Sequence, residues 1–180
     1  MASSSPVKFV YGLFIIIAFI FTLIALFTPA WRSYKGDGAP TFGVVTRDCG
    51  HGYRKVFDWD CQKWATKYPF EKITLALLIL ALFFEIMAIG CFFGLLSPRL
   101  RLQMPAISLS FLAFISLFAA IIIYAVRNEK KTAYLLSQTY ELLADTSLGY
   151  SYWLALIATL FAFLATASAG GVVSKMTAVE

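Results

Sequence analysis

Four long apolar stretches dominate the hydrophobic pattern of this 180-residue chain, and polar loops separate them. The stretches are residues 7–28, 73–96, 105–126 and 150–171, each of about 22 residues. Roughly 20 residues suffice to cross a hydrocarbon core of roughly 30 Å as a helix. Because that core offers no partners to backbone N–H and C=O groups, helices are the expected spanning structure. The pattern predicts a single four-span membrane domain over residues 1–180, with loops at 29–72, 97–104 and 127–149.

The polar pattern of the first long loop predicts β structure on both sides of a glycine turn. Residues 41–49 are rich in Val and Thr, and residues 53–61 alternate between apolar and polar types. Such period-2 alternation is typical of a half-buried strand. A tight hairpin at Gly50-His51-Gly52 would set Cys49 beside Tyr53, whereas a disulfide from Cys49 to Cys61 needs Cα atoms within about 7 Å. Either the chain reverses nearer Lys55, or the glycines form a bulge.

The second long loop carries no helix-breaking residue over most of its length. After Pro105 neither Gly nor Pro occurs before Gly149, which predicts that span three continues as a helix through residues 128–144. Tyr140 and Leu143 lie among the apolar positions of this extension and are candidate contacts to a partner. In span four, small residues recur at helical spacing and let a neighbouring helix approach closely: Ala158, Ala162, Ala165 and Ala169.

Composition and charge narrow the functional classes. Residues of apolar type make up 60% of the chain, against roughly 45–50% in soluble globular domains. The net charge of +5 resides in loops beside the spans, which favours contact with membrane lipids over nucleic acid. Trp31 and Tyr34 are expected at headgroup depth. The first span exceeds the roughly 7–15 apolar residues of a signal peptide, so we expect it to be retained.

No catalytic chemistry is indicated by the sequence. An enzyme needs a nucleophile with a base, a metal cluster or paired carboxylates, and none of these arrangements is evident. His51 is expected to be a solvated loop histidine, and no catalytic residue, metal site or cofactor is predicted.

Two arguments about orientation oppose each other. A Cys49–Cys61 disulfide requires an oxidising compartment, which places the loop 29–72 outside the cell and both termini in the cytoplasm. The count of Lys and Arg favours the reverse, because the two long loops hold eleven of them and the other side only four. The short loop 97–104 is basic and free of acids, as expected for a cytoplasmic turn. We therefore expect a plasma-membrane protein with both termini inside.

Glu85 is the single acid within a predicted span. Burying an ionisable group in the bilayer costs free energy, so such a residue is a functional candidate by default. One interpretation makes it a contact to a channel partner. The other makes it a buried, neutral carboxyl that bonds to Ser or Thr of a neighbouring helix.

The residues Trp31, Gly43, Cys49 and Cys61 form a constellation that resembles the first loop of the claudin superfamily. That superfamily includes claudins, peripheral myelin and epithelial membrane proteins, and stargazin-like subunits. Its motif is a Trp, then Gly-Leu-Trp, then two cysteines; here Gly43-Val44-Val45 keeps only the Gly. Residues 148–155 also resemble the beginning of the family's fourth span. The resemblance implies an all-α transmembrane four-helix bundle with a small extracellular antiparallel β-sheet, built mostly from the first loop.

The same resemblance implies a structural, interaction-based function. The first hypothesis is a component of a cell–cell contact, junction or barrier whose outer loops meet other copies of the protein in the same or the opposing membrane. Lys63 and Lys67 would then be candidates for charge selectivity. The alternative is a stargazin-like auxiliary subunit of an ion channel or receptor, for which Glu85, the alanine stripe and the span-three extension would supply contacts.

Overall fold

The computed structural model describes residues 6–59, 61, 68–96, 102–128, 131–135 and 141–177. Its long helices are α1 (Pro6–Phe27), α3 (Pro69–Leu96), α4 (Gln103–Arg127) and α5 (Tyr150–Thr177). Its strands are β1 (Arg32–Tyr34), β2 (Thr41–Phe42), β3 (Arg47–Asp48), β4 (Lys131–Leu135) and β5 (Glu141–Leu148). A short 3₁₀ helix, Gly52–Arg54, follows β3.

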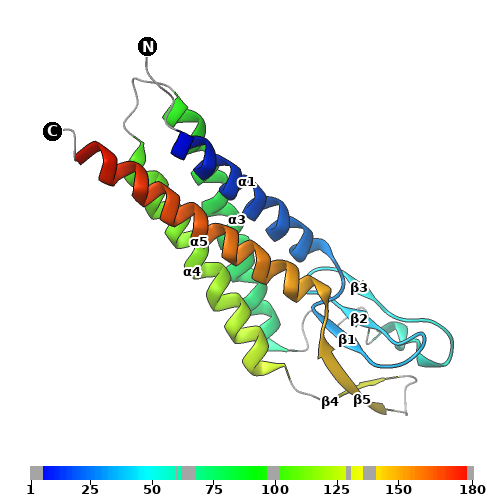
Figure 1. Cartoon of the computed structure of the whole chain (residues 1–180). Coiled ribbons are helices and arrows are strands. Elements are labelled where there is room, and N and C mark those ends of the chain that lie inside the picture. Colours follow the sequence, from blue (N-terminus) through cyan, green and yellow to red (C-terminus); the bar gives the residue numbers. More distant parts are fainter. Residues whose placement is uncertain are drawn as a thin grey trace.

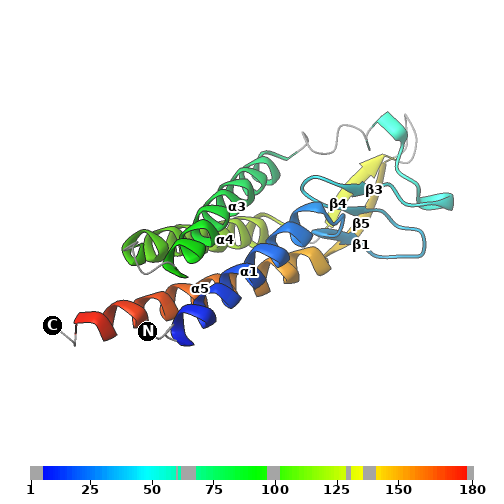
Figure 2. The same cartoon turned by 90° about the horizontal axis from the view of Figure 1, so that it is seen from above.

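The four long helices form one bundle, and the strands gather at one of its ends (Figure 1). Helix α1 packs against α3 and α5, and α4 packs against the same two helices, so the contacts close into a ring. Both chain termini lie at the opposite end of the bundle from the sheet, and Figure 2 shows the same separation from above. We call these ends the sheet end and the terminal end. All four helices are long and apolar enough to cross a membrane.

Alanines occupy much of the bundle interior, together with large side chains such as Ile15, Leu78 and Leu117. Fully buried alanines lie seven residues apart in α1, α3 and α4, and alternately three and four residues apart in α5, where Ala155, Ala158, Ala162 and Ala165 face inward. This spacing is that of left-handed helix bundles. Large apolar side chains such as Phe93 point outward and are more than half exposed. Close packing of small residues is how helices associate where lipid removes the hydrophobic driving force.

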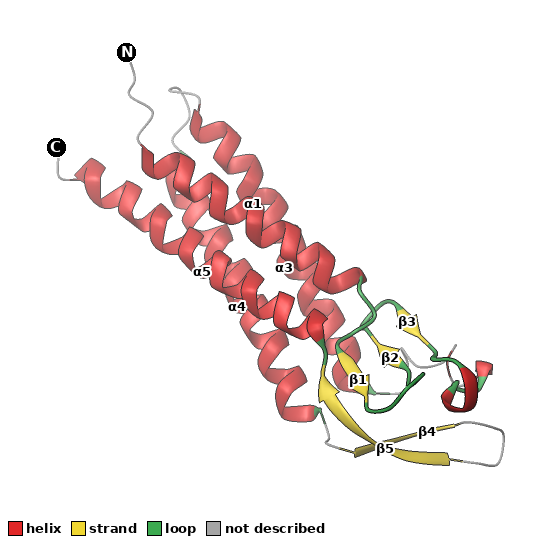
Figure 3. Cartoon of the chain, turned by 45° about the vertical axis from the view of Figure 1, so that its right-hand side comes forward, coloured by secondary structure: helices red, strands yellow, loops and turns green. Residues whose placement is uncertain are grey.

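The sheet has five strands in the order β3-β2-β1-β5-β4, and every neighbouring pair is antiparallel (Figure 3). Strand β1 lies in the centre, where Arg32 is opposite Phe42 on one side and Leu148 on the other. The bundle with a small antiparallel sheet confirms the predicted fold class.

The predicted helical extension of span three is wrong. Helix α4 ends at Arg127, and Asn128 has extended backbone angles of φ −75° and ψ 101°. Beyond it, β4 and β5 pair as a hairpin, and β5 continues the sheet beside β1. Helix propensity is a weak preference that tertiary context overrides. Here β5 supplies backbone partners along β1, which a helix could not do.

The first loop also differs from its predicted strands. Residues 41–49 form two short strands with a bend between them, and the described residues of the predicted second strand, 53–59 and 61, form no strand. The chain reverses direction between Cys49 and Val56. Gly50 and Gly52 within this turn have positive φ values, and the Val56 N–H donates to the Cys49 carbonyl over 2.8 Å. A helical bond of 2.9 Å from the Cys61 N–H to the Phe57 carbonyl follows. The buried side chains of this segment are therefore those of Val56 and Cys61, and not every second residue as a strand would require.

Candidate functional site

Trp31 anchors the sheet to the bundle from a fully buried position. Its indole Nε1 donates to the Ala25 carbonyl of α1 over 2.6 Å, and its ring lies edge-on to Tyr124, with 4.9 Å between centroids. Its backbone bonds to Phe42 of β2 on one side and to Gly149, after β5, on the other. The ring therefore packs inside the protein rather than against lipid, and its depth relative to the headgroups stays a prediction.

Gly43 stands where the chain bends tightly against the end of α1. Its N–H donates to the Thr46 carbonyl over 2.9 Å, which closes the bend between β2 and β3. A Cβ at this position would lie 2.5 Å from the Thr28 carbonyl oxygen, too close for any other residue without movement of the backbone. The one glycine retained from the family motif is thus required by close packing.

Arg32 forms a buried polar cluster between the sheet and two helices. Its side chain donates to the Asn128 Oδ1 over 2.8 Å and forms an ion pair of 3.5 Å with Glu71, at the start of α3. The guanidinium carbon also lies 5.0 Å from the ring centroid of Tyr68 and 5.5 Å from that of Phe70. Because Arg32 and Glu71 are each almost fully buried, this cluster connects β1 with the beginning of α3 and the end of α4.

Electrostatics keep the arginine of this cluster charged. Burial lowers the pKa of the Arg32 guanidinium, but nearby Tyr124, Glu71 and Tyr34 oppose it, and the net effect raises that pKa. For the Tyr34 phenol, burial raises the pKa, because the neutral form is favoured, and Arg32 partly offsets this rise. The cluster is therefore a fixed cation with neutral phenols and one carboxylate around it. Such an arrangement holds structure together and offers no base poised to take a proton.

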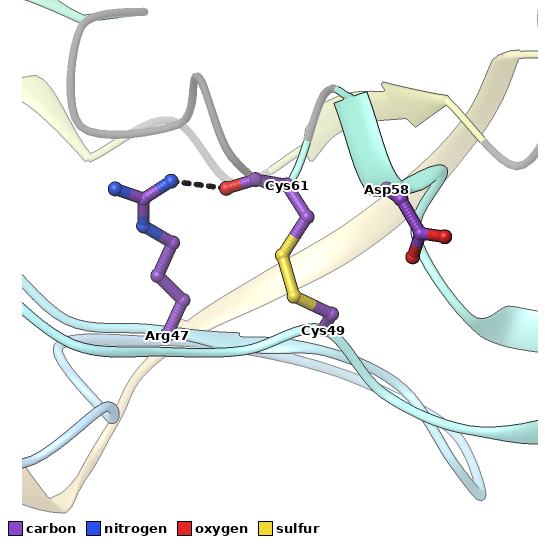
Figure 4. Close-up of a pocket in the computed structure, with 4 residues that line it drawn as sticks. All are labelled: Arg47, Cys49, Asp58 and Cys61. Carbon is purple, nitrogen blue, oxygen red and sulfur yellow. Dashed lines mark hydrogen bonds between the residues drawn. A yellow bond between two sulfur atoms is a disulfide. The ribbon is translucent and has the colours of Figure 1, made fainter.

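A disulfide closes the first loop, as predicted. Cys49 and Cys61 are bonded, with 6.0 Å between their Cα atoms. Beside them lies an open hollow of about 500 Å³, lined by Arg47 and Asp58 together with the two cysteines (Figure 4). Arg47 donates to the Cys61 carbonyl, and Asp58 points away from the disulfide and pairs with Lys55 over 3.0 Å. The described charges at this hollow thus have partners within the loop.

The distal part of the sheet end exposes large side chains to solvent. Tyr53 is fully exposed in the 3₁₀ helix, and Leu143 of β5 is 64% exposed. The cyan segment around Tyr53 and the far end of β5 both lie away from the bundle in Figure 1. These two side chains are thus solvent-facing parts of the sheet end.

The structure places the other predicted contact residues differently. Glu85 is fully buried, and its Oε1 lies within hydrogen-bond distance, 3.0 Å, of the Thr22 Oγ1 of α1, a contact of the kind that the second interpretation of this residue describes. The alanine stripe of α5 faces the bundle interior. Lys63, Lys67 and Tyr140 lie outside the described residues. Among the residues that are described, no three His, Cys, Asp or Glu side chains come together as a metal site.

A family model described as "Tight junction protein, Claudin-like" matches residues 1–176. The chain belongs to this claudin-like family. No individual curated protein matches it. Membership and the four apolar helices make the chain a multi-pass membrane protein whose expected contacts are lipids and other membrane proteins. Claudin-like proteins are in general structural rather than enzymatic.

Sequence reasoning missed the Arg32 cluster of this claudin-like protein. Arg32 and Glu71 were counted only as loop charges, although their burial is among the most specific features of the sheet end. One signal was available for Glu71: it precedes Thr74, Leu78 and Ala81 at spacings of three, four and three residues, and all four side chains are buried on one face of α3. No comparable signal distinguishes Arg32 from its exposed basic neighbours.

Proposed function

We propose that this claudin-like protein acts at cell–cell contacts, where its sheet end projects from the plasma membrane and meets other copies of the protein. The disulfide supports this orientation, because such a bond persists in an oxidising compartment. The terminal end would then face the cytoplasm, and the chain would work as a single four-span domain without enzymatic activity.

The observation that carries the proposal is a sheet that specific contacts hold to the bundle and that presents exposed side chains. Trp31, the Arg32 cluster and the disulfide fix the inner part of the sheet end, whereas Tyr53 and Leu143 project from its distal part. Preorganised contact surfaces bind without the entropic cost of ordering loops. A platform of this kind suits repeated contact between identical proteins.

The auxiliary-subunit alternative has less support. Of its three candidate features, Glu85 and the alanine stripe are buried within the bundle, and the helical extension is a hairpin. A channel partner could then contact only the outer faces of the helices. These faces are ordinary apolar surfaces, which lipid would cover equally well. Contact through the sheet end is therefore the preferred function.

The experiment mixes two populations of non-adherent cells, one of which expresses a tagged copy. Under the proposal, the protein concentrates where two expressing cells touch and stays uniform where an expressing cell touches a non-expressing one. Uniform distribution at both kinds of contact would contradict the junction function and favour the auxiliary-subunit alternative. Surface labelling of the tag controls for delivery to the plasma membrane.

We also propose that the first loop makes the contact weakly selective against cations. It holds eight basic and five acidic residues. The buried Arg32–Glu71 pair removes one of each from the surface, and the excess of three basic residues remains. Glu in place of both Lys63 and Lys67 should raise the permeability of an expressing cell layer to sodium relative to chloride. Unchanged ion preference would contradict a role for these two lysines, while leaving the contact function intact.

A further inference from the structure

Glu85 and Thr22 share a hydrogen-bond arrangement in which one proton is missing. The Thr22 Oγ1 lies 2.9 Å from the Ala18 carbonyl oxygen and 3.0 Å from Glu85 Oε1. Both oxygens are placed as acceptors, but a hydroxyl has a single proton to donate and two lone pairs with which to accept. Thr22 therefore cannot satisfy Ala18 and an ionised Glu85 at the same time.

Among the described residues, Glu85 has no cation to pair with and no hydrogen-bond donor other than the Thr22 hydroxyl. Its side chain is completely buried. The ion pairs among the described residues are Arg32–Glu71 and Lys55–Asp58, so no described cation pairs with Glu85. Its second oxygen, Oε2, has no hydrogen-bond partner in the described part of the chain. An isolated buried carboxylate is far more costly than a neutral polar group in the same place.

A proton on the carboxyl resolves the geometry. A neutral Glu85 donates its O–H to the Thr22 Oγ1, and Thr22 then donates its own proton to the Ala18 carbonyl. Each of the two short distances becomes a hydrogen bond with one donor and one acceptor. The remaining Oε2 is then a carbonyl oxygen, which carries much less charge than a carboxylate oxygen and so loses less when it has no donor.

We propose that Glu85 is a neutral carboxylic acid at physiological pH and that its proton links α3 to the backbone of α1 through Thr22. Glu85 is thus a positioning residue for the α1–α3 contact within the membrane, independent of any partner. The alignment of these helices determines how the end of α1 meets β1, because only four residues separate the two elements.

Infrared spectroscopy of the purified protein in an ester-free detergent tests the protonation state directly. The other nine acidic side chains lie outside the apolar spans, so Glu85→Gln identifies which band belongs to Glu85. We expect a carbonyl stretching band of a protonated carboxylic acid at pH 7, which Glu85→Gln removes. A wild-type spectrum with no such band at pH 7 would overturn the proposal without any variant.

Substitutions of Thr22 test the proton path. In Thr22→Val the acid loses its acceptor, so its carbonyl band should move to a higher frequency, whereas Thr22→Ser should leave the band in place. Thr159→Val is the matched control, because Thr159 also donates to its own helix, at Ala155, and has no contact to Glu85. A band that Thr22→Val leaves unmoved would show that the acid does not donate to Thr22.

The melting temperatures of two Glu85 variants show whether this hydrogen bond, or only the volume of the side chain, stabilises the protein. Glu85→Gln retains an N–H donor and nearly the same volume, so its melting temperature in detergent should match that of the wild type. Glu85→Met fills similar space without a donor and should melt at a lower temperature. Equal losses in the Gln and Met variants would contradict the donor role assigned to the Glu85 proton.

Discussion

The bundle and the sheet end achieve stability in different ways. In the bundle, a repeated pattern of small residues packs four helices together, and no single alanine is unique. At the sheet end, single residues with specific partners hold short strands in place: Trp31, Arg32, Gly43 and the Cys49–Cys61 disulfide. Loss of one alanine contact leaves the pattern intact, whereas loss of one anchor removes a whole connection. The predictions below compare matched substitutions in these two regions.

Trp31→Ala should have the largest effect. It removes a fully buried indole, its hydrogen bond to Ala25 and its contact with Tyr124. We expect a loss of about 5 kcal/mol, the upper part of the range for a buried aromatic residue. Trp153→Ala is the control, because Trp153 lies on the outer surface and is 54% exposed. Thermal unfolding in detergent measures the stability of the two variants. Similar losses of stability in both would contradict the role of Trp31.

Breaking the Arg32–Glu71 pair should come next. Glu71→Leu leaves a buried guanidinium without its carboxylate, at a cost of about 3–5 kcal/mol. Replacing both residues, as Arg32→Met with Glu71→Leu, should recover much of that loss because no charge is stranded. Asp58→Ala breaks the exposed Lys55–Asp58 pair and should cost about 0–1 kcal/mol. A double variant less stable than Glu71→Leu would show that the two side chains do not act as a pair.

Removing the disulfide should have an intermediate effect. Ser at both Cys49 and Cys61 should cost about 2–4 kcal/mol, mainly because the unfolded chain gains freedom. The free Cys91, which is only partly buried in α3, provides the control as Cys91→Ser. Chemical unfolding of the wild type and of both variants, with and without reductant, compares their free energies of unfolding. If reductant destabilises the wild type no more than the double Ser variant, the bond contributes nothing to stability.

Enlarging one alanine of the bundle should have the smallest effect on stability in this series. Ala162→Leu places a large side chain in the interior and should cost about 1–3 kcal/mol through overpacking. Ala167→Leu makes the same change on an exposed position of the same helix and should be nearly neutral. A neutral result for both positions, by thermal unfolding in detergent, would contradict the inward placement of the alanine stripe.

The sequence allowed the bundle to be predicted more fully than the sheet end. Each span is uniformly apolar, so its position is evident, and the alanines of span four already marked one packing face. The anchors of the sheet end depend on contacts between distant positions, such as Arg32 with Glu71 and Asn128. Local patterns also misled: the alternation of residues 53–61 resembles a strand, yet Tyr53 is exposed and a turn of helix brings Cys61 to Cys49.

We have proposed that the sheet end presents its exposed side chains to other copies of the protein. The most direct measurement is the enrichment of Tyr53→Ser/Leu143→Ser at contacts between two expressing cells, relative to the wild type at equal surface density. Met104→Ser is the control, because Met104 is equally apolar and exposed but lies at the terminal end. The double variant should lose its enrichment while remaining folded, and the control should keep it. Full enrichment of the double variant would contradict contact through this surface.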